Sequence, residues 1–135
     1  DHAVARICAP AGAADSVNDL SMVVEVAYRE SGVLFTGDLS AEGEPSPLPD
    51  VDVLKVPHHG SAQACSDRML AELTPEISVI PVGENNYGHP SEQTLERLES
   101  AGSEVYRTDE CGAVTVRILR DGAIRVKTYL PVEEP

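Results

Sequence analysis

Three successive segments of β-forming residues each end in a turn that places aspartate or histidine beside glycine. The turns hold Asp38, the adjacent pair His58 and His59, and His89. Loops at one edge of an open α/β sheet collect ligand-binding residues, and glycine lets the backbone turn sharply there. The coincidence at three strand ends therefore predicts an α/β fold in which these four side chains belong to one site.

Hydrophobic patterning along the rest of the chain predicts two helices among several strands. The expected strands are 21–28, 33–36, 51–56, 76–82, 105–108, 113–119 and 123–130, and the expected helices are 65–73 and 91–102. Ser66 is a plausible N-cap, Pro90 suits a first helical position, and Gly102 ends the second helix. Residues 29–32 predict a hairpin turn, and Asp121-Gly122 strongly favours another. Residues 40–50 hold three prolines, which indicates a loop or a short broken helix.

Composition limits the classes of function. The 135 residues suit one domain, and no apolar run approaches the roughly 20 residues that span a bilayer. The formal charge of −13 argues against a broad basic surface for nucleic acid, although a divalent metal could still hold a phosphate. The acidic residues are dispersed, as on a solvated surface. Three cysteines without a CxxC pair are interpreted as small apolar residues.

Aspartate and histidine are residue types that bind zinc, manganese or iron. Each position alone has a simpler interpretation: Asp38 follows Gly37 as turn residues often do, and His89 could be a helix N-cap or a packing residue. Their occurrence at three consecutive strand ends favours a metal site.

The sequence resembles a known family. The motifs LFTGDLSAEGE, DVDVLKVPHHGS and the segment 85–116 match, in order, the C-terminal metallo-β-lactamase-like domain of ComEC, a bacterial DNA-uptake competence family. The segment 17–26 resembles the stretch before the second half of that domain, so the resemblance covers roughly residues 17–118. It implies an αββα sandwich of two similar halves around a metal site. The chain would be the C-terminal half, a single partial domain over 1–135 with a mixed sheet and two main helices.

The resemblance also implies roles for the four residues. Asp38 corresponds to a metal-bridging, catalytic aspartate. One histidine of the pair corresponds to a metal ligand; His58 is favoured because it directly follows the strand, but His59 stays open. His89 matches a motif histidine that contacts substrate or transition state, or supports the ligands. The implied reaction is hydrolysis of a DNA phosphodiester at two zinc or manganese ions.

One family motif is absent. The superfamily binds metal first through HxHxDH, and Asp1-His2 is not such a motif. We therefore expect a missing N-terminal half outside these residues, an inactive fragment, and a homodimer or higher oligomer through the exposed sheet. By resemblance, the chain would be a soluble domain of a bacterial membrane-associated protein. The alternatives are a degenerate, structural module of a DNA-uptake protein and an α/β binding domain with chance motifs.

Overall fold

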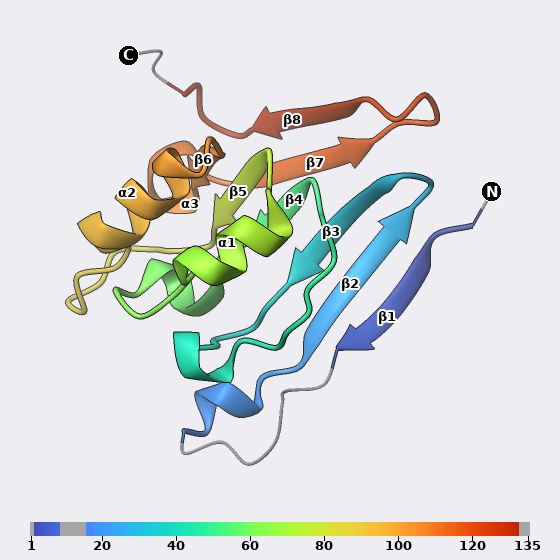
Figure 1. Ribbon diagram of the computed structural model, residues 1–135. Coiled ribbons are helices and arrows are strands. Elements are labelled where there is room, and N and C mark those ends of the chain that lie inside the picture. The colour runs from blue at the N-terminus through green and yellow to red at the C-terminus, as the bar shows by residue number, and fades with distance from the viewer. Residues whose placement is uncertain (1, 9–15, 133–135) are drawn as a thin grey trace.

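The computed structural model describes residues 2–8 and 16–132, and its centre is a six-stranded mixed sheet (Figure 1). The strands lie in sequence order: β1 (Val4–Cys8), β2 (Val23–Tyr28), β3 (Ser31–Phe35), β4 (Val53–Lys55), β5 (Ile77–Ile80) and β6 (Glu104–Arg107). The first three strands pair antiparallel, and β3 to β6 pair parallel. This architecture confirms the predicted mixed α/β class and agrees with a partial metallo-β-lactamase fold.

Two helices follow the parallel strands, as the sequence predicted. In α1 (Asp67–Leu73), the Ser66 hydroxyl accepts a hydrogen bond from the Met69 amide at 3.1 Å. In α2 (Glu92–Ser100), Ser91 is the N-cap. The expectation that Pro90 occupies the first helical position is therefore wrong. Pro90 precedes the cap, because the Ser91 hydroxyl already accepts from an amide of the first turn.

The helices cover one face of the sheet and form the core with it (Figure 1). Among the fully buried side chains are several from alternate strand positions and from the helices: Leu34, Leu54, Ile80, Met69, Leu73 and Leu98. Each side chain of this size contributes about 1.5–3 kcal/mol of hydrophobic stabilisation when it is buried. The core therefore fixes the strands that carry the candidate residues.

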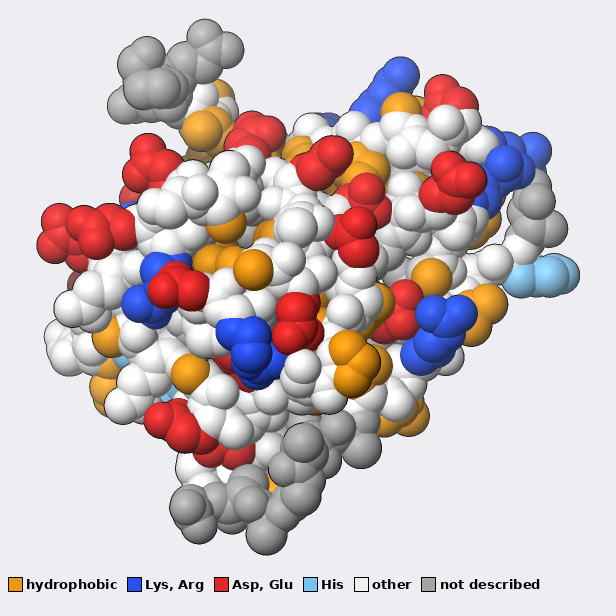
Figure 2. Space-filling model, viewed as in Figure 1, with side chains coloured by type: hydrophobic (Ala, Val, Ile, Leu, Met, Phe, Trp, Pro, Cys, Tyr) orange, Lys and Arg blue, Asp and Glu red, His pale blue; other side chains and the backbone are white. Residues whose placement is uncertain are grey.

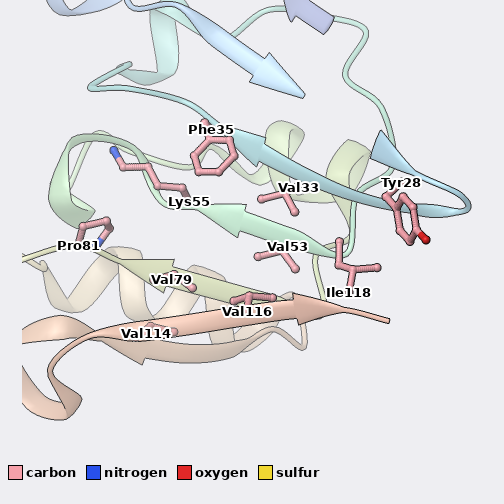
Figure 3. Close-up of a pocket in the computed structure, with 10 residues that line it drawn as sticks. All are labelled: Tyr28, Val33, Phe35, Val53, Lys55, Val79, Pro81, Val114, Val116 and Ile118. Atoms are coloured by element: carbon pink, nitrogen blue, oxygen red, sulfur yellow. The ribbon is translucent and has the colours of Figure 1, made fainter. Parts of the chain in front are cut away.

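The opposite face of the sheet is partly covered by the hairpin of β7 (Val114–Ile118) and β8 (Ile124–Thr128). An apolar groove of about 570 Å³ separates the sheet from β7 (Figure 3). Its lining is Tyr28, Val33, Phe35, Val53, Lys55, Val79, Pro81, Val114, Val116 and Ile118. Phe35 keeps 47% of its surface exposed in this groove. This sheet face is thus only partly buried within the described residues.

Several short elements were not predicted. They are β1, α3 (Thr108–Cys111) and the 3₁₀ helices at Asn18–Leu20 and Pro57–Gly60. Residues 40–50, expected to be a loop or a short broken helix, contain a short 3₁₀ helix at Ala41–Gly43. All three cysteines are free, and Cys65 and Cys111 are buried, as expected of small apolar residues.

Across residues 2–8 and 16–132, no helix has the length and hydropathy needed to span a membrane.

Candidate functional site

The parallel pairing of β3, β4 and β5 brings the three predicted turns to one edge of the sheet. Phe35 lies opposite Lys55, which lies opposite Val79. Beyond these positions, the His58 amide donates to the Gly37 carbonyl at 3.2 Å, so the first two turns are bonded to each other. The turns are adjacent because parallel strands place their carboxyl ends at the same edge.

Asp38 lies in a turn whose backbone is fixed by Ser21. The Asp38 amide donates to the Ser21 hydroxyl at 3.0 Å. Gly37 has φ +57°, and a Cβ atom there would lie 2.6 Å from Ser21 Cβ, so only glycine fits. The Asp38 side chain itself remains 45% exposed. Its carboxylate is therefore positioned by the backbone and open to a ligand.

Lys55 places a positive charge beside this carboxylate. Its Nζ donates to the Gly37 carbonyl at 2.6 Å and lies 4.0 Å from Asp38 Oδ1. Burial lowers the pKa of Lys55, and the nearby Asp38 carboxylate acts in the opposite direction. We did not predict Lys55 as a site residue. The available signal was a lysine at the end of a buried strand, three residues before His58.

His59 points towards Asp38. Its Nδ1 lies 2.6 Å from the Pro81 carbonyl oxygen, and its Nε2 lies 3.8 Å from Asp38 Oδ1. Because a carbonyl oxygen can only accept, Nδ1 carries a proton, so Nε2 is the ring nitrogen on the carboxylate side that is available to a ligand. Histidine ligands of metals are commonly oriented by a backbone carbonyl in this way.

The ring of His58 packs against the ring of His89. Their ring centroids are 5.6 Å apart with an interplanar angle of 64°. His58 and His59 both have a left-handed backbone, with φ of +47° and +52°. Such conformations are uncommon for residues other than glycine and concentrate at functional sites. The strained turn sends the two neighbouring imidazoles in different directions.

His89 is partly buried, like His58, whereas His59 is exposed. Burial lowers the pKa of His89, and His58 and His59 lower it further. Its Nδ1 is buried without a hydrogen-bond partner in the described part of the chain. Since Ser91 caps α2, the interpretation of His89 as an N-cap is wrong. His59 and His89 both line a cavity of about 340 Å³.

The residues fit half of a metal site. Asp38 Oδ1 and His59 Nε2 are close enough for one ion to contact both at the usual distances of about 2.0–2.2 Å. Among the described residues, no group of three or more His, Cys, Asp or Glu side chains is arranged to hold a metal ion. The two ligand atoms are therefore fewer than the three or four that protein zinc sites use.

Comparison with known proteins identifies the family. Residues 17–84, half of the chain, match the model of the Metallo-beta-lactamase superfamily. The chain is 35% identical over 108 residues to ComE operon protein 3 of Bacillus subtilis, covering 76% of this chain and 14% of that protein. It is 34% identical over 108 residues to Recombination protein 2 of Haemophilus influenzae, covering 77% and 14%.

A third relative is Competence protein ComA of Neisseria gonorrhoeae, 34% identical over 121 residues, covering 83% of this chain and 18% of that protein. The chain thus spans less than a fifth of the curated relatives it matches. The names of these relatives agree with the resemblance of the three sequence motifs to the competence family. With its mixed sheet and the matched segment 17–84, the chain belongs to the metallo-beta-lactamase superfamily.

Proposed function

We propose that this chain supplies one side of a metal-dependent phosphodiesterase site in a DNA-uptake protein. The observation that carries the proposal is the pairing of Asp38 with His59 at the end of the parallel strands, with Nε2 held 3.8 Å from the carboxylate. Superfamily membership favours a hydrolase, and the competence-type relatives favour DNA as the substrate and a membrane-associated parent protein.

We assign the metal-ligand role to Asp38 and His59. This differs from the expectation that favoured His58 for its place directly after the strand. His58 packs against His89, whereas His59 is oriented by the Pro81 carbonyl towards Asp38. Zinc or manganese would be held there, and when bound it supplies the positive charge that polarises a phosphoryl oxygen and lowers the pKa of water. Lys55 holds the Gly37 carbonyl, and thereby the Asp38 turn, in place.

His89 is assigned a substrate contact. It shares the 340 Å³ cavity with His59, and its lowered pKa favours the neutral ring near pH 7. A neutral imidazole can donate a hydrogen bond to a phosphate or leaving-group oxygen that occupies this cavity. The remaining metal ligands would come from a segment that carries the HxHxDH motif, outside these residues.

Manganese titration of the 135-residue chain tests the ligand assignment. We expect weak binding, in the millimolar range of dissociation constants, because two ligands leave most of the coordination to water. Paramagnetic broadening of NMR signals should be strongest at Asp38 and His59 and should be lost from His59 in Asp38→Ala. The matched control is Glu99→Gln, an exposed carboxylate of α2. Tight stoichiometric binding, or broadening spread evenly over the acidic residues, would refute the half-site.

Self-association through the partly covered sheet face is a second proposal. The apolar groove beside β7 leaves Phe35 half exposed, and apolar sheet faces favour pairing (Figure 3). We expect a homodimer or higher oligomer by light scattering at high protein concentration. Phe35→Asp should shift the chain towards monomer, whereas Tyr129→Ser, an exposed residue that does not line the groove, should not. A wild-type monomer at every concentration would rule the proposal out.

A further inference from the structure

We propose that Tyr87 is a stacking platform for an unpaired nucleobase that flanks the phosphodiester at Asp38 and His59. The inference rests on the proposed function and adds the form of its substrate, a single-stranded nucleic acid. Bases stack on aromatic rings without regard to sequence, whereas paired bases of a duplex are already stacked on each other. Tyr87 would therefore select an unpaired strand.

The first observation is the position of the ring. The Tyr87 residue is 84% exposed, although its ring stacks beside the imidazole of His89. The two ring centroids are 6.0 Å apart, and the planes differ by only 25°. Tyr87 therefore extends an aromatic surface outward from His89, and most of that surface is open to a planar ligand.

The second observation is that hydrogen bonds fix the backbone of the loop that carries this exposed ring. Asn85 Oδ1 accepts from the amides of Tyr87 at 3.0 Å and His89 at 3.1 Å. Asn85 Nδ2 donates to the carbonyls of Gly83 at 2.9 Å and His89 at 2.8 Å. One side chain thus ties both ends of the turn. Because the loop backbone is already ordered, binding of a base to Tyr87 does not have to order the loop, which lowers the entropic cost of binding.

The third observation is the cavity that joins Tyr87 to the proposed metal ligand. Tyr87, His89 and His59 line the same space of about 340 Å³, which is within the size range of small-molecule sites. A base on Tyr87 and a phosphate near His59 could therefore belong to neighbouring positions of one strand. The lining contains Glu84 but no lysine or arginine.

The charge of the protein supports stacking as the mode of contact. The chain carries −13, and acidic side chains are spread over the face seen in Figure 2 with basic ones scattered between them. Because no lysine or arginine lines the cavity, basic side chains do not attract phosphates into it, and base contacts have to provide affinity. Binding that depends on stacking should not weaken between low and moderate salt, unlike binding through many lysine and arginine contacts, because salt screens the repulsion between this acidic chain and the strand.

Binding of a six-nucleotide oligothymidylate to this chain in EDTA tests the proposal. NMR titration should shift the Tyr87 ring signals upfield, as expected for a ring under a stacked base. Tyr87→Phe should bind as the wild type does, and Tyr87→Ala should bind about fivefold to a hundredfold more weakly. Tyr129→Ala is the matched control, because Tyr129 is also exposed, at 80%, but does not line this cavity.

Three further ligands define the contact. An abasic oligomer of equal length and a duplex should each bind more weakly than oligothymidylate, and oligouridylate tests whether the strand must be DNA. Absence of binding, equal binding of the abasic oligomer, or a Tyr87→Ala effect below twofold would overturn the inference. Because EDTA removes metal, this outcome is independent of hydrolysis. If oligothymidylate stacks on Tyr87 but manganese does not broaden the signals of Asp38 and His59, only the phosphodiesterase proposal is rejected. If manganese broadens those signals but no base stacks on Tyr87, only the stacking platform is rejected.

Discussion

Hydrolysis of a DNA phosphodiester is expected to be undetectable with these 135 residues alone and measurable once an HxHxDH segment is added. The reason is the ligand set: Asp38 and His59 are brought together, but no third ligand joins them in the described part of the chain. Without a firmly held ion, water keeps its high pKa and little hydroxide is available near pH 7. The measurement is release of nitrophenol from a bis-nitrophenyl phosphate with added Mn²⁺ or Zn²⁺, with the HxHxDH segment supplied in the same chain or separately.

Variants of the active, longer protein identify the ligands. Asp38→Ala and His59→Asn should each lower the rate at least about 100-fold, since loss of groups that merely support metal ligands already costs 10–100-fold. His58→Asn should cost less, because the His58 ring packs against His89, whereas the contact with Asp38 is made by His59. Asparagine is used because it tolerates the left-handed backbone of both histidines. Glu99→Gln, on the exposed face of α2, is the control that should leave the rate unchanged.

Three results would count against this account. Metal-dependent cleavage by the isolated chain would refute the half-site. A longer, HxHxDH-containing protein that is active but indifferent to Asp38→Ala would refute the assigned role of Asp38. A folded longer protein that contains HxHxDH, binds metal and never cleaves would support the degenerate, structural module.

The order of strands and helices was predictable because each element has a strong local signal. Ser66 precedes an apolar helical pattern, and Asp121-Gly122 joins two alternating segments; the structure shows an N-cap and a hairpin at these places. Shorter elements lacked such signals. The helix α3 spans only Thr108–Cys111, so its sequence has no repeated apolar face. Arg107, at the end of β6, forms ion pairs of 2.8 Å with Asp109 and Glu110 of α3, and helix propensity alone does not indicate these contacts.

The candidate site was predictable in its location but not in its orientation. The strand order places Asp38 and the two histidines at one edge of the sheet, and the positions of these residues after successive predicted strands had indicated this. Which imidazole faces Asp38 depends on two successive left-handed residues, a backbone conformation that the sequence HHG does not specify by itself. The role of Lys55 likewise depends on the register that sets Phe35 opposite Lys55 and brings Nζ to the Gly37 carbonyl. Both features are products of tertiary packing.

Gly60, at the junction of the histidine turns, should be sensitive to substitution. Gly60 is buried with φ +78°, and a Cβ atom there would lie 2.7 Å from Pro90 Cβ and 3.2 Å from Pro90 Cα. Its carbonyl also accepts from the Ser91 amide at 2.8 Å, which joins the turn after β4 to the start of α2. Gly60→Ala should therefore lower the free energy of unfolding by about 2–5 kcal/mol, from the left-handed backbone and the steric overlap together.

Chemical denaturation measures this loss, and two other glycines separate its causes. Gly88→Ala has φ +76° but open space around the new Cβ, so it should show only the backbone cost of about 1–2 kcal/mol. Gly83→Ala has neither constraint and should change stability by less than about 0.5 kcal/mol. In Gly60→Ala the Pro90 ring must also move, so NMR contacts between His58 and His89 should weaken. If Gly60→Ala matches Gly88→Ala in stability and keeps those contacts, the two turns are not packed against each other at Gly60 and Pro90.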